Sequence, residues 1–140
     1  LPWRDKKIKI DNSYYLIDSS ISKYVKKLNE YGYKTTNTCS GLLYDHYGQK
    51  RIESMYGKEI IETPYLSLKK FSPEVSSCIT DAVKDVSKNV NVTIEKSGNI
   101  TFRYNTETYI NKSKEIYDRD VKQFWDDITS SILESGCIDK

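Results

Sequence analysis

The residues of this chain most able to do covalent chemistry are a thiol and an imidazole that lie near each other in the sequence. His46 is the only histidine, Asp45 precedes it directly, and Cys39 lies a short distance before them. A cysteine nucleophile needs a base within hydrogen-bond reach and a group that orients the base, and these three residues could supply all of them. Asp45 and His46 could instead act as an acid/base pair or position a substrate. The remaining interpretation is a partly exposed loop histidine without a chemical role.

The cysteines are three in number and widely spaced: Cys39, Cys78 and Cys137. A zinc site made of Cys39, His46 and one further cysteine would lack the short ligand spacing of structural zinc sites, so we expect no metal. An odd number of cysteines at such separations does not indicate a disulfide framework and favours a reducing compartment. We therefore expect Cys78 to pack as a small apolar residue in a helix core.

Size and composition exclude several classes of protein. A chain of 140 residues is long enough for one domain without metals or disulfides. Its mean hydropathy is -0.67, and no apolar run approaches the ~18 residues of a membrane-spanning helix, so we expect no membrane partner. The start of the chain has no pattern of a secretory leader, and we expect a cytoplasmic protein. Dinucleotide, phosphate-loop, HExxH and paired CxxC motifs are absent from the sequence.

Two local clusters of lysine occur although the net charge is only +2. One cluster consists of Lys23, Lys26, Lys27 and Lys34, and the other of Lys69 and Lys70. The first cluster is our candidate for nucleic-acid binding, and the alternative is the ordinary solvated side of a helix. Because so weakly basic a chain can neutralise few phosphates, we expect any RNA binding to be weak and sensitive to salt.

Hydrophobic periodicity predicts the elements that must position these residues. Apolar residues at helical spacing indicate amphipathic helices at about 19–31, 75–86 and 113–134. Alternation and β-branched content predict strands at 33–38, 64–70, 90–95 and 100–105, the last two as a hairpin. A short extended segment is expected at 7–10, and residues 44–62, which have no sustained period, are expected to form an exposed irregular excursion.

This order of elements predicts one α+β domain spanning residues 1–140. A mixed sheet with helices packed mainly on one face would bury all the apolar stripes in a single pair of layers. Asp18 or Ser19 is expected to cap the first helix, and Ser72 the second. Trp125 belongs to the apolar face of the last helix and is expected to be buried.

A family resemblance is carried by the segment from Leu28 to Gly41. A helix that ends in Leu-Asn, a strand containing an aromatic residue and then Thr-Thr-x-x-Cys-Ser-Gly resemble the N-terminal motif of the tRNA wybutosine-synthesis methyltransferase family. The residues that match the family motif are Thr35, Thr36, Cys39, Ser40 and Gly41. Asn37 and Thr38 stand where the family has two serines, and Leu42 where it has an arginine.

The resemblance implies a tRNA partner and S-adenosylmethionine as the cofactor, for methyl transfer to a tricyclic guanosine derivative. Such a displacement is accelerated by alignment and needs no protein nucleophile. A turn of small residues could present backbone N–H groups and hydroxyls to the cofactor's carboxylate, so Thr36, Cys39, Ser40 and Gly41 are the candidate cofactor-binding residues. We expect this turn to line a concave site open to solvent.

Three other interpretations remain beside the methyltransferase. In the plainest, the residues of the turn only satisfy local backbone groups. The chain could also be a non-catalytic module on the same fold that binds nucleic acid or protein, or a different small-molecule enzyme.

Overall fold

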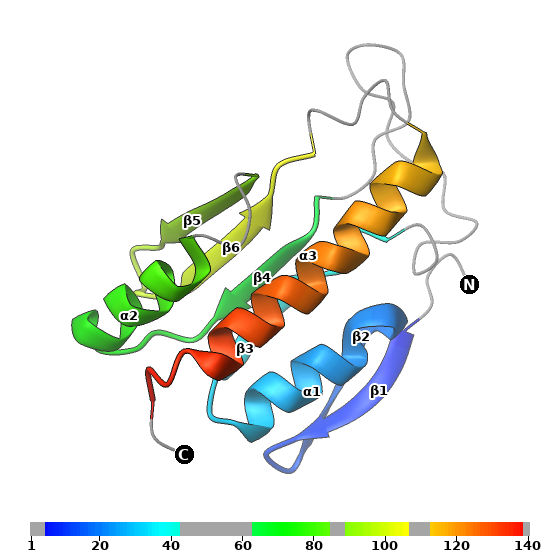
Figure 1. The fold of residues 1–140 in the computed structure, drawn as a ribbon. Helices are drawn as coiled ribbons and strands as arrows, with labels where there is room; N and C mark the ends of the chain where they lie inside the picture. Colours follow the sequence, from blue (N-terminus) through cyan, green and yellow to red (C-terminus); the bar gives the residue numbers. More distant parts are fainter. Residues whose placement is uncertain (1–4, 43–62, 85–88, 107–112, 139–140) are drawn as a thin grey trace.

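The chain folds as an α+β structure (Figure 1). The computed structural model describes residues 5–42, 63–84, 89–106 and 113–138. In chain order the elements are β1 (Asp5–Ile10), β2 (Ser13–Asp18), the 3-10 helix η1 (Ser19–Ile21), α1 (Ser22–Glu30), β3 (Thr35–Cys39), β4 (Tyr65–Leu68), α2 (Pro73–Lys84), β5 (Val90–Ile94), β6 (Ile100–Tyr104) and α3 (Lys114–Glu134). The predicted fold class is confirmed, whereas the predicted excursion at 44–62 lies outside the described residues.

The main sheet has four strands in the order β3-β4-β6-β5, and each neighbouring pair is antiparallel. The sequence predicts a mixed sheet, and the difference has a simple cause. β4, α2 and β5 form a crossover whose two strands run parallel, but β6 turns back from β5 and inserts between them. The parallel strands are therefore not neighbours, as in a split βαβ unit.

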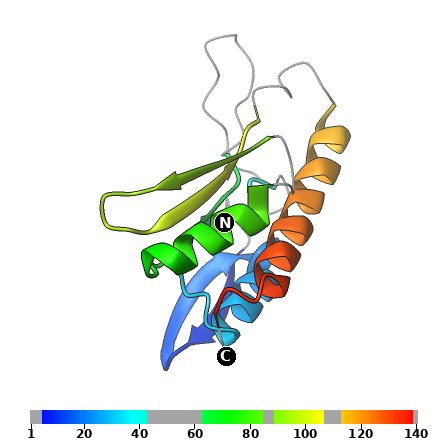
Figure 2. The same cartoon turned by 60° about the vertical axis from the view of Figure 1, so that its left-hand side comes forward.

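The two faces of the main sheet differ in the polarity of their side chains. Leu66, Phe102 and Val92 are aligned across three strands and belong to the apolar core or pack against it. In the next row, the hydroxyls of Ser67 and Thr101 lie 2.8 Å apart and form a buried hydrogen bond. Successive side chains of a strand point to opposite faces, so the sheet has one apolar face and one polar face. The helices lie on one side of the sheet (Figures 1 and 2).

The helix α3 contributes Trp125, the largest fully buried side chain among the described residues. Trp125 has no exposed surface and Phe124 is 2% exposed, as the apolar spacing predicts. The ring of Phe124 lies 5.0 Å from that of Tyr104 on β6 and 5.4 Å from that of Trp125, measured between centroids. Tilted and edge-to-face rings at these distances are typical of well-packed cores. The helix therefore packs directly against the sheet.

Cys78 and Cys137 form a disulfide bond, with Cα atoms 5.7 Å apart, so the prediction of unpaired cysteines is wrong. The bond joins α2 to the segment after α3, and Cys78 lies on the exposed side of its helix, not in the core as predicted. Pairing depends on which distant residues the fold brings together, and sequence spacing does not reveal this. Because disulfides are typical of oxidising compartments, cysteine usage no longer supports a reducing one. The third cysteine, Cys39, does not take part in this disulfide.

The strands β1 and β2 form a separate two-stranded antiparallel sheet. The sequence predicts an extended segment at 7–10 but not the strand β2. The hairpin turns at Asp11 and Asn12, whose φ angles are +48° and +70°, the conformation of a type I′ turn that these residue types favour. β2 was missed because residues 14–17 are apolar or aromatic on both faces and do not alternate.

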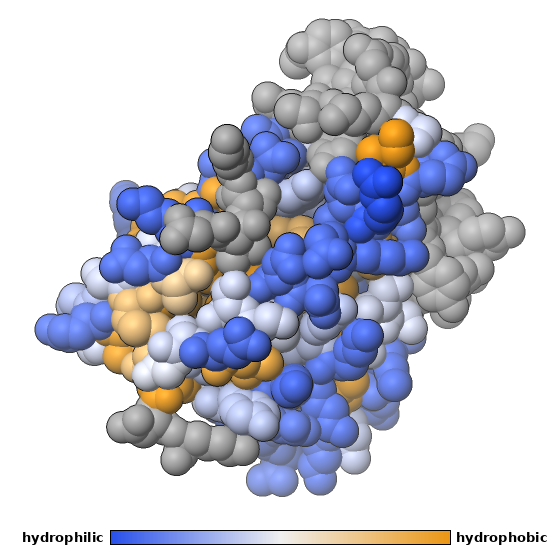
Figure 3. Space-filling view, viewed as in Figure 1, coloured by the Kyte–Doolittle hydropathy of each residue, from blue (hydrophilic) through white to orange (hydrophobic). Residues whose placement is uncertain are grey.

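The surface in the view of Figure 3 is mostly hydrophilic over α1 and α3. Apolar residues show toward α2 and β5, and Ile94 at the end of β5 is 57% exposed. Within the described part of the chain, no helix combines the length and apolar character needed to cross a bilayer.

Candidate functional site

The turn Cys39-Ser40-Gly41 follows β3 and reverses direction at Gly41. The φ angle of Gly41 is +69°, in the left-handed region that favours glycine. A Cβ atom at this position would overlap the ring of Pro64, which immediately precedes β4. Gly41 is therefore required by both the backbone conformation and the close approach of Pro64.

The polar groups of this turn are occupied by partners within the chain. The Ser40 N–H donates to the Asp18 carboxylate at 2.8 Å, and the Leu42 N–H donates to the Ser40 hydroxyl oxygen at 3.1 Å. Two residues of α3 donate to the carbonyls: the Trp125 indole to Ser40 at 2.9 Å and the Tyr117 hydroxyl to Gly41 at 2.7 Å. The hydrogen bonds of the turn therefore connect the end of β3 to β2 and to α3.

The burial of the turn disagrees with the expected solvent-open concavity. Ser40 has no exposed surface and Cys39 is 7% exposed. Asp18, expected as the cap of the first helix, makes no side-chain capping hydrogen bond and instead accepts from Ser40. A buried N–H that already has a carboxylate partner cannot also bind a ligand without losing that partner. Binding at this turn would require local rearrangement.

The other motif residues also have structural partners. Thr36 is exposed, and its hydroxyl donates to the Ser67 carbonyl at 3.4 Å. Thr35 donates its N–H to the Asn29 side-chain oxygen at 3.1 Å, and the Asn29 amide donates to the Val25 carbonyl at 2.7 Å. Asn29 is buried at the end of α1 and holds the start of β3. The motif therefore includes an asparagine whose evident role is to connect a helix to a strand.

Neither of the predicted catalytic candidates is described by the structure, and only Cys39 of the Cys-His hypothesis is. Asp45 and His46 lie outside the described residues, and Cys39 is buried. Among the residues that the structure does describe, no group of three His, Cys, Asp or Glu side chains could hold a metal ion. The Cys-His and Asp-His hypotheses stay predictions.

The predicted lysine cluster lies on the exposed side of α1 and just beyond it. Lys23, Lys26 and Lys27 are all exposed, and spacings of three and four residues place them on one side of the helix. Val25 and Leu28 have no exposed surface and form the opposite side. The periodicity that predicts the helix therefore also predicts where these lysines lie.

The fourth lysine of the cluster is tied to the hairpin. Lys34 forms an ion pair of 2.6 Å with Asp11 in the turn between β1 and β2. The side chain of Lys34 is 41% exposed and that of Asp11 is 69% exposed. An exposed pair of this kind contributes little stability, but it places the hairpin turn next to the start of β3.

The hairpin adds a surface that sequence reasoning missed. Lys7 and Leu16 are cross-strand partners, as are Lys9 and Tyr14, so these four side chains share one face of the hairpin. Tyr14 is 61% exposed and Leu16 is 70% exposed. The ammonium groups of Lys7 and Lys9 lie 4.7 Å and 5.8 Å from the centre of the Tyr14 ring. We call this surface the outer face of the hairpin.

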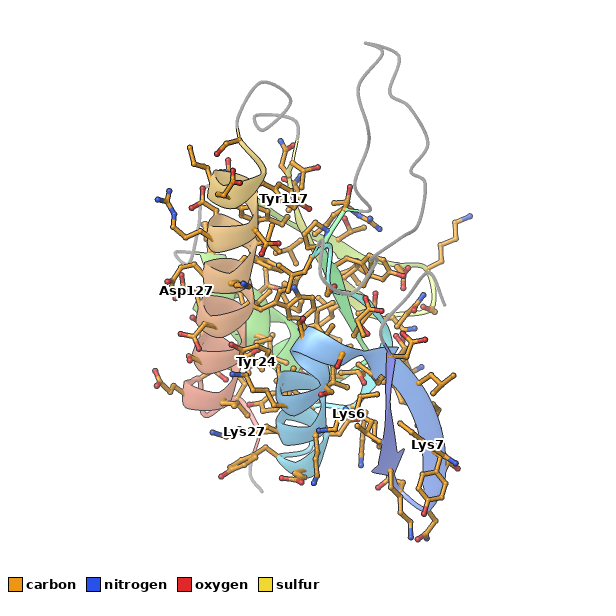
Figure 4. The ribbon with its side chains drawn as sticks, turned by 90° about the vertical axis from the view of Figure 1, so that its right-hand side faces the viewer. Lys6, Lys7, Tyr24, Lys27, Tyr117 and Asp127 are labelled. Carbon is orange, nitrogen blue, oxygen red and sulfur yellow. A yellow bond between two sulfur atoms is a disulfide. The ribbon has the colours of Figure 1, made fainter. Side chains whose placement is uncertain are left out.

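Figure 4 shows how these elements lie beside one another, with α3 at the left, α1 in the centre and the hairpin at the right. Lys7 points away from α1, whereas Lys6, the next residue along β1, points toward α1. On α1, the Tyr24 hydroxyl donates to Asp126 of α3 at 3.5 Å.

The only sequence signal for the outer face is the Asp11-Asn12 pair between two extended segments, which marks a tight hairpin.

Charge is distributed unevenly among these elements. Residues 5–34 contain seven lysines and four acidic residues, whereas α3 contains six acidic and three basic residues. Two of the four acids in the first segment, Asp11 and Asp18, are already hydrogen-bonded to Lys34 and Ser40. The hairpin has three lysines and three aspartates, so the positive excess of residues 5–34 comes from α1 and Lys34, whereas α3 is acidic.

No protein-family model, no curated protein and no solved structure matches this chain. The resemblance to the wybutosine-synthesis methyltransferases stays a prediction that rests on residues 28–41.

Proposed function

We propose that this chain is a nucleic-acid-binding module, and that it contacts phosphates through lysines of the hairpin and α1. We call these lysines the basic region: Lys6, Lys7, Lys9, Lys23, Lys26 and Lys27. The observation that carries the proposal is the separation of charge between residues 5–34, with an excess of three positive charges, and the acidic helix α3. The six lysines are all exposed.

Phosphate binding by exposed lysines needs no buried pocket. Each lysine that neutralises a phosphate releases a condensed counterion, and this release drives binding at low salt. An asymmetric charge distribution also orients the protein as it approaches a polyanion, because the acidic side is repelled. A weak net charge of +2 is therefore compatible with binding through one side of the molecule.

The test is the affinity of the chain for a labelled single-stranded oligonucleotide, measured by fluorescence anisotropy between about 50 and 200 mM salt. We expect a logarithmic salt slope of about -3 if about four phosphates are contacted. The variant Lys23→Gln/Lys26→Gln/Lys27→Gln removes three positive charges from α1 and should weaken binding and flatten the slope. An affinity that does not change with salt would refute the proposal.

A matched control removes the same charge elsewhere. Lys69, Lys70 and Lys84 are exposed and lie outside the basic region, on the β4–α2 connection and the end of α2. Substituting these three by glutamine should leave affinity close to that of the parent chain. Equal losses in both triple variants would mean that net charge, and not the basic region, controls binding.

The methyltransferase remains the second candidate, supported by the match of Thr35, Thr36, Cys39, Ser40 and Gly41 to the family motif. Its cofactor would have to displace internal partners such as Asp18 from the Ser40 N–H, or bind elsewhere. Titration with S-adenosylmethionine in a calorimeter tests it directly, because this function alone requires that the cofactor binds.

A further inference from the structure

We infer that the outer face of the hairpin binds single-stranded nucleic acid, with a base stacked on Tyr14 and with Lys7 and Lys9 on the flanking phosphates. This inference rests on the proposed function, since it assumes a nucleic-acid partner. It adds that the partner is single-stranded and that Tyr14 distinguishes it from a duplex.

The exposure of Tyr14 is the first observation behind this inference. Burial of a large ring normally contributes to stability, yet Tyr14 is 61% exposed and its strand neighbour Leu16 is 70% exposed. Both side chains lie on the same face of a two-stranded sheet, with Lys7 and Lys9 directly opposite them. An exposed ring beside an exposed aliphatic chain offers a flat apolar platform, and bases stack on such platforms with little regard to sequence.

The positions of the two lysines are the second observation. Lys7 and Lys9 are two residues apart on β1, and both ammonium groups approach the Tyr14 ring, at 4.7 Å and 5.8 Å from its centre. A base that stacks on Tyr14 would bring its own phosphates within reach of these flexible side chains. Aromatic stacking combined with cationic contacts to the backbone is the usual design of surfaces for single strands.

The residue types on this face favour a single strand over a duplex. A two-stranded ribbon can enter the major groove, where it reads base edges mainly with Arg, Lys, Asn or Gln side chains. Of these types the outer face carries only lysine, beside Tyr14 and Leu16, and the next cross-strand pair on the same face is Asp5 with Asp18. In a duplex the faces of the bases are already stacked on one another, so Tyr14 would have no partner.

The tip of the hairpin makes a membrane surface the weaker alternative. Hairpins and helices that insert at an interface bury an apolar surface among the lipids. Here the tip is Asp11-Asn12, and the Asp11 carboxylate is held by Lys34 at 2.6 Å. A tip made of a polar and an ion-paired side chain would be costly to insert into lipid.

The experiment compares four probes with the whole chain: oligouridylate, oligothymidylate, a duplex of equal length and inorganic polyphosphate, which has phosphates but no bases. We expect the single strands to bind more tightly than the duplex. Tyr14→Ala should weaken binding of the single strands roughly 5- to 150-fold, the range typical of alanine substitution at one stacking aromatic residue. The same substitution should leave polyphosphate binding unchanged, and Tyr14→Trp should retain the affinity of the parent chain.

The matched control is Tyr31→Ala, which removes another exposed tyrosine, 41% exposed and located after α1. It should not change affinity for any probe. The two single strands distinguish RNA from DNA as the bound form, and either result supports stacking on Tyr14.

Several outcomes would overturn the inference. Equal affinity for duplex and single strand, or a Tyr14→Ala variant that binds single strands as the parent does, would exclude stacking. The proposed function would then still stand if the α1 lysine variant lost binding, and would fall if it did not. Binding to vesicles of phosphatidylcholine and phosphatidylserine without binding to any oligonucleotide would favour a membrane partner and refute both.

A second measurement does not depend on the variant being folded. Photocrosslinking of the parent chain to an oligonucleotide containing 4-thiouridine, followed by peptide mapping, locates the base directly. A crosslink within residues 13–18 supports the inference, and crosslinks confined to other segments would overturn it.

Discussion

The indole N–H of Trp125 donates a hydrogen bond of 2.9 Å to the carbonyl oxygen of Ser40, a residue 85 positions away in the sequence. Neither residue has exposed surface. About two turns earlier on α3, the Tyr117 hydroxyl donates to the Gly41 carbonyl at 2.7 Å. Two polar side chains of one helix thus satisfy consecutive carbonyls of the turn after β3. The stability of that turn should therefore depend on α3.

Substitution Tyr117→Phe removes one donor without changing the shape of the ring. Tyr117 is 4% exposed, so the Gly41 carbonyl would lose its partner in a buried place. We expect the free energy of unfolding to fall by about 1–3 kcal/mol, measured by denaturant titration. Tyr24→Phe is the control, because its hydroxyl makes a long, exposed contact of 3.5 Å with Asp126 and its loss should have little effect. Equal midpoints for the two variants would show that the buried bond is unimportant.

Alanine at Gly41 should destabilise the fold more than alanine at Gly136. The two glycines have nearly equal φ angles, +69° and +68°, so a side chain costs each about the same in backbone energy, roughly 1–2 kcal/mol. A Cβ at Gly41 would overlap Pro64, whereas a Cβ at Gly136 would have nothing within 4 Å. The difference in unfolding free energy between the two variants measures the steric overlap alone. A larger loss at Gly136 would contradict the described packing of the turn.

Reduction of the disulfide should lower stability substantially. The bond links residues 59 apart in the sequence, and a crosslink of that span removes enough chain entropy from the unfolded state to contribute about 4 kcal/mol. The Cys78→Ser/Cys137→Ser variant and the reduced parent chain should unfold at similar, lower denaturant concentrations than the oxidised chain. Coincident unfolding curves for the oxidised and reduced forms would show that the bond does not form in solution.

A thiol titration checks the same bond without reference to stability. The chain has three cysteines, of which Cys39 is buried and lies outside the disulfide. The oxidised native chain should react slowly with a thiol reagent, one thiol should react after unfolding, and three should react after unfolding and reduction.

Thr129→Val should stabilise the chain. The Thr129 hydroxyl is buried, and it has no hydrogen-bond partner within the described part of the structure. Valine has nearly the same shape and removes the desolvation cost of that hydroxyl, so we expect an increase of about 1 kcal/mol in the free energy of unfolding. Thr93→Val on the exposed side of β5 is the control and should have a much smaller effect. A destabilised Thr129→Val chain would mean that the hydroxyl does have a partner.

The helices and the β5–β6 hairpin could be predicted because their apolar spacing agrees with their environment. Val121, Phe124 and Ile128 recur at helical spacing and are all buried in α3. In the hairpin, Val90 and Val92 alternate with polar residues, since one face of that strand packs against the core. Local pattern and tertiary packing favour the same structure in these elements.

The strand β2 and the disulfide could not be predicted from the same signals. Tyr14, Tyr15 and Leu16 are all at least half exposed, so the pattern that normally distinguishes the core face of a strand is missing. The partner of Cys78 is set by the path of α3, which brings Cys137 beside α2. Neither fact is encoded in a short window of residues.

The candidate site was predicted in part. The exposure of Lys23, Lys26 and Lys27 follows from the helical periodicity of their neighbours and is confirmed. The burial of Ser40 depends on Trp125, which lies far along the chain, so small residues in a turn looked available for a ligand. The outer face of the hairpin requires the pairing of β1 with β2 and becomes visible only in the fold.

Because a disulfide links α2 to the C-terminal segment, a protease cut before Cys78 and one after it have different consequences. β5, β6 and α3 all lie between Cys78 and Cys137, whereas the hairpin, α1, β3 and β4 precede Cys78. A single peptide bond cut between residues 78 and 137 leaves two fragments still joined through sulfur, so they migrate as one species until a reducing agent is added. A cut between Lys27 and Cys78 instead frees the segment that carries the basic region. Digestion therefore separates the proposed binding segment from the rest only when cleavage falls between these two residues.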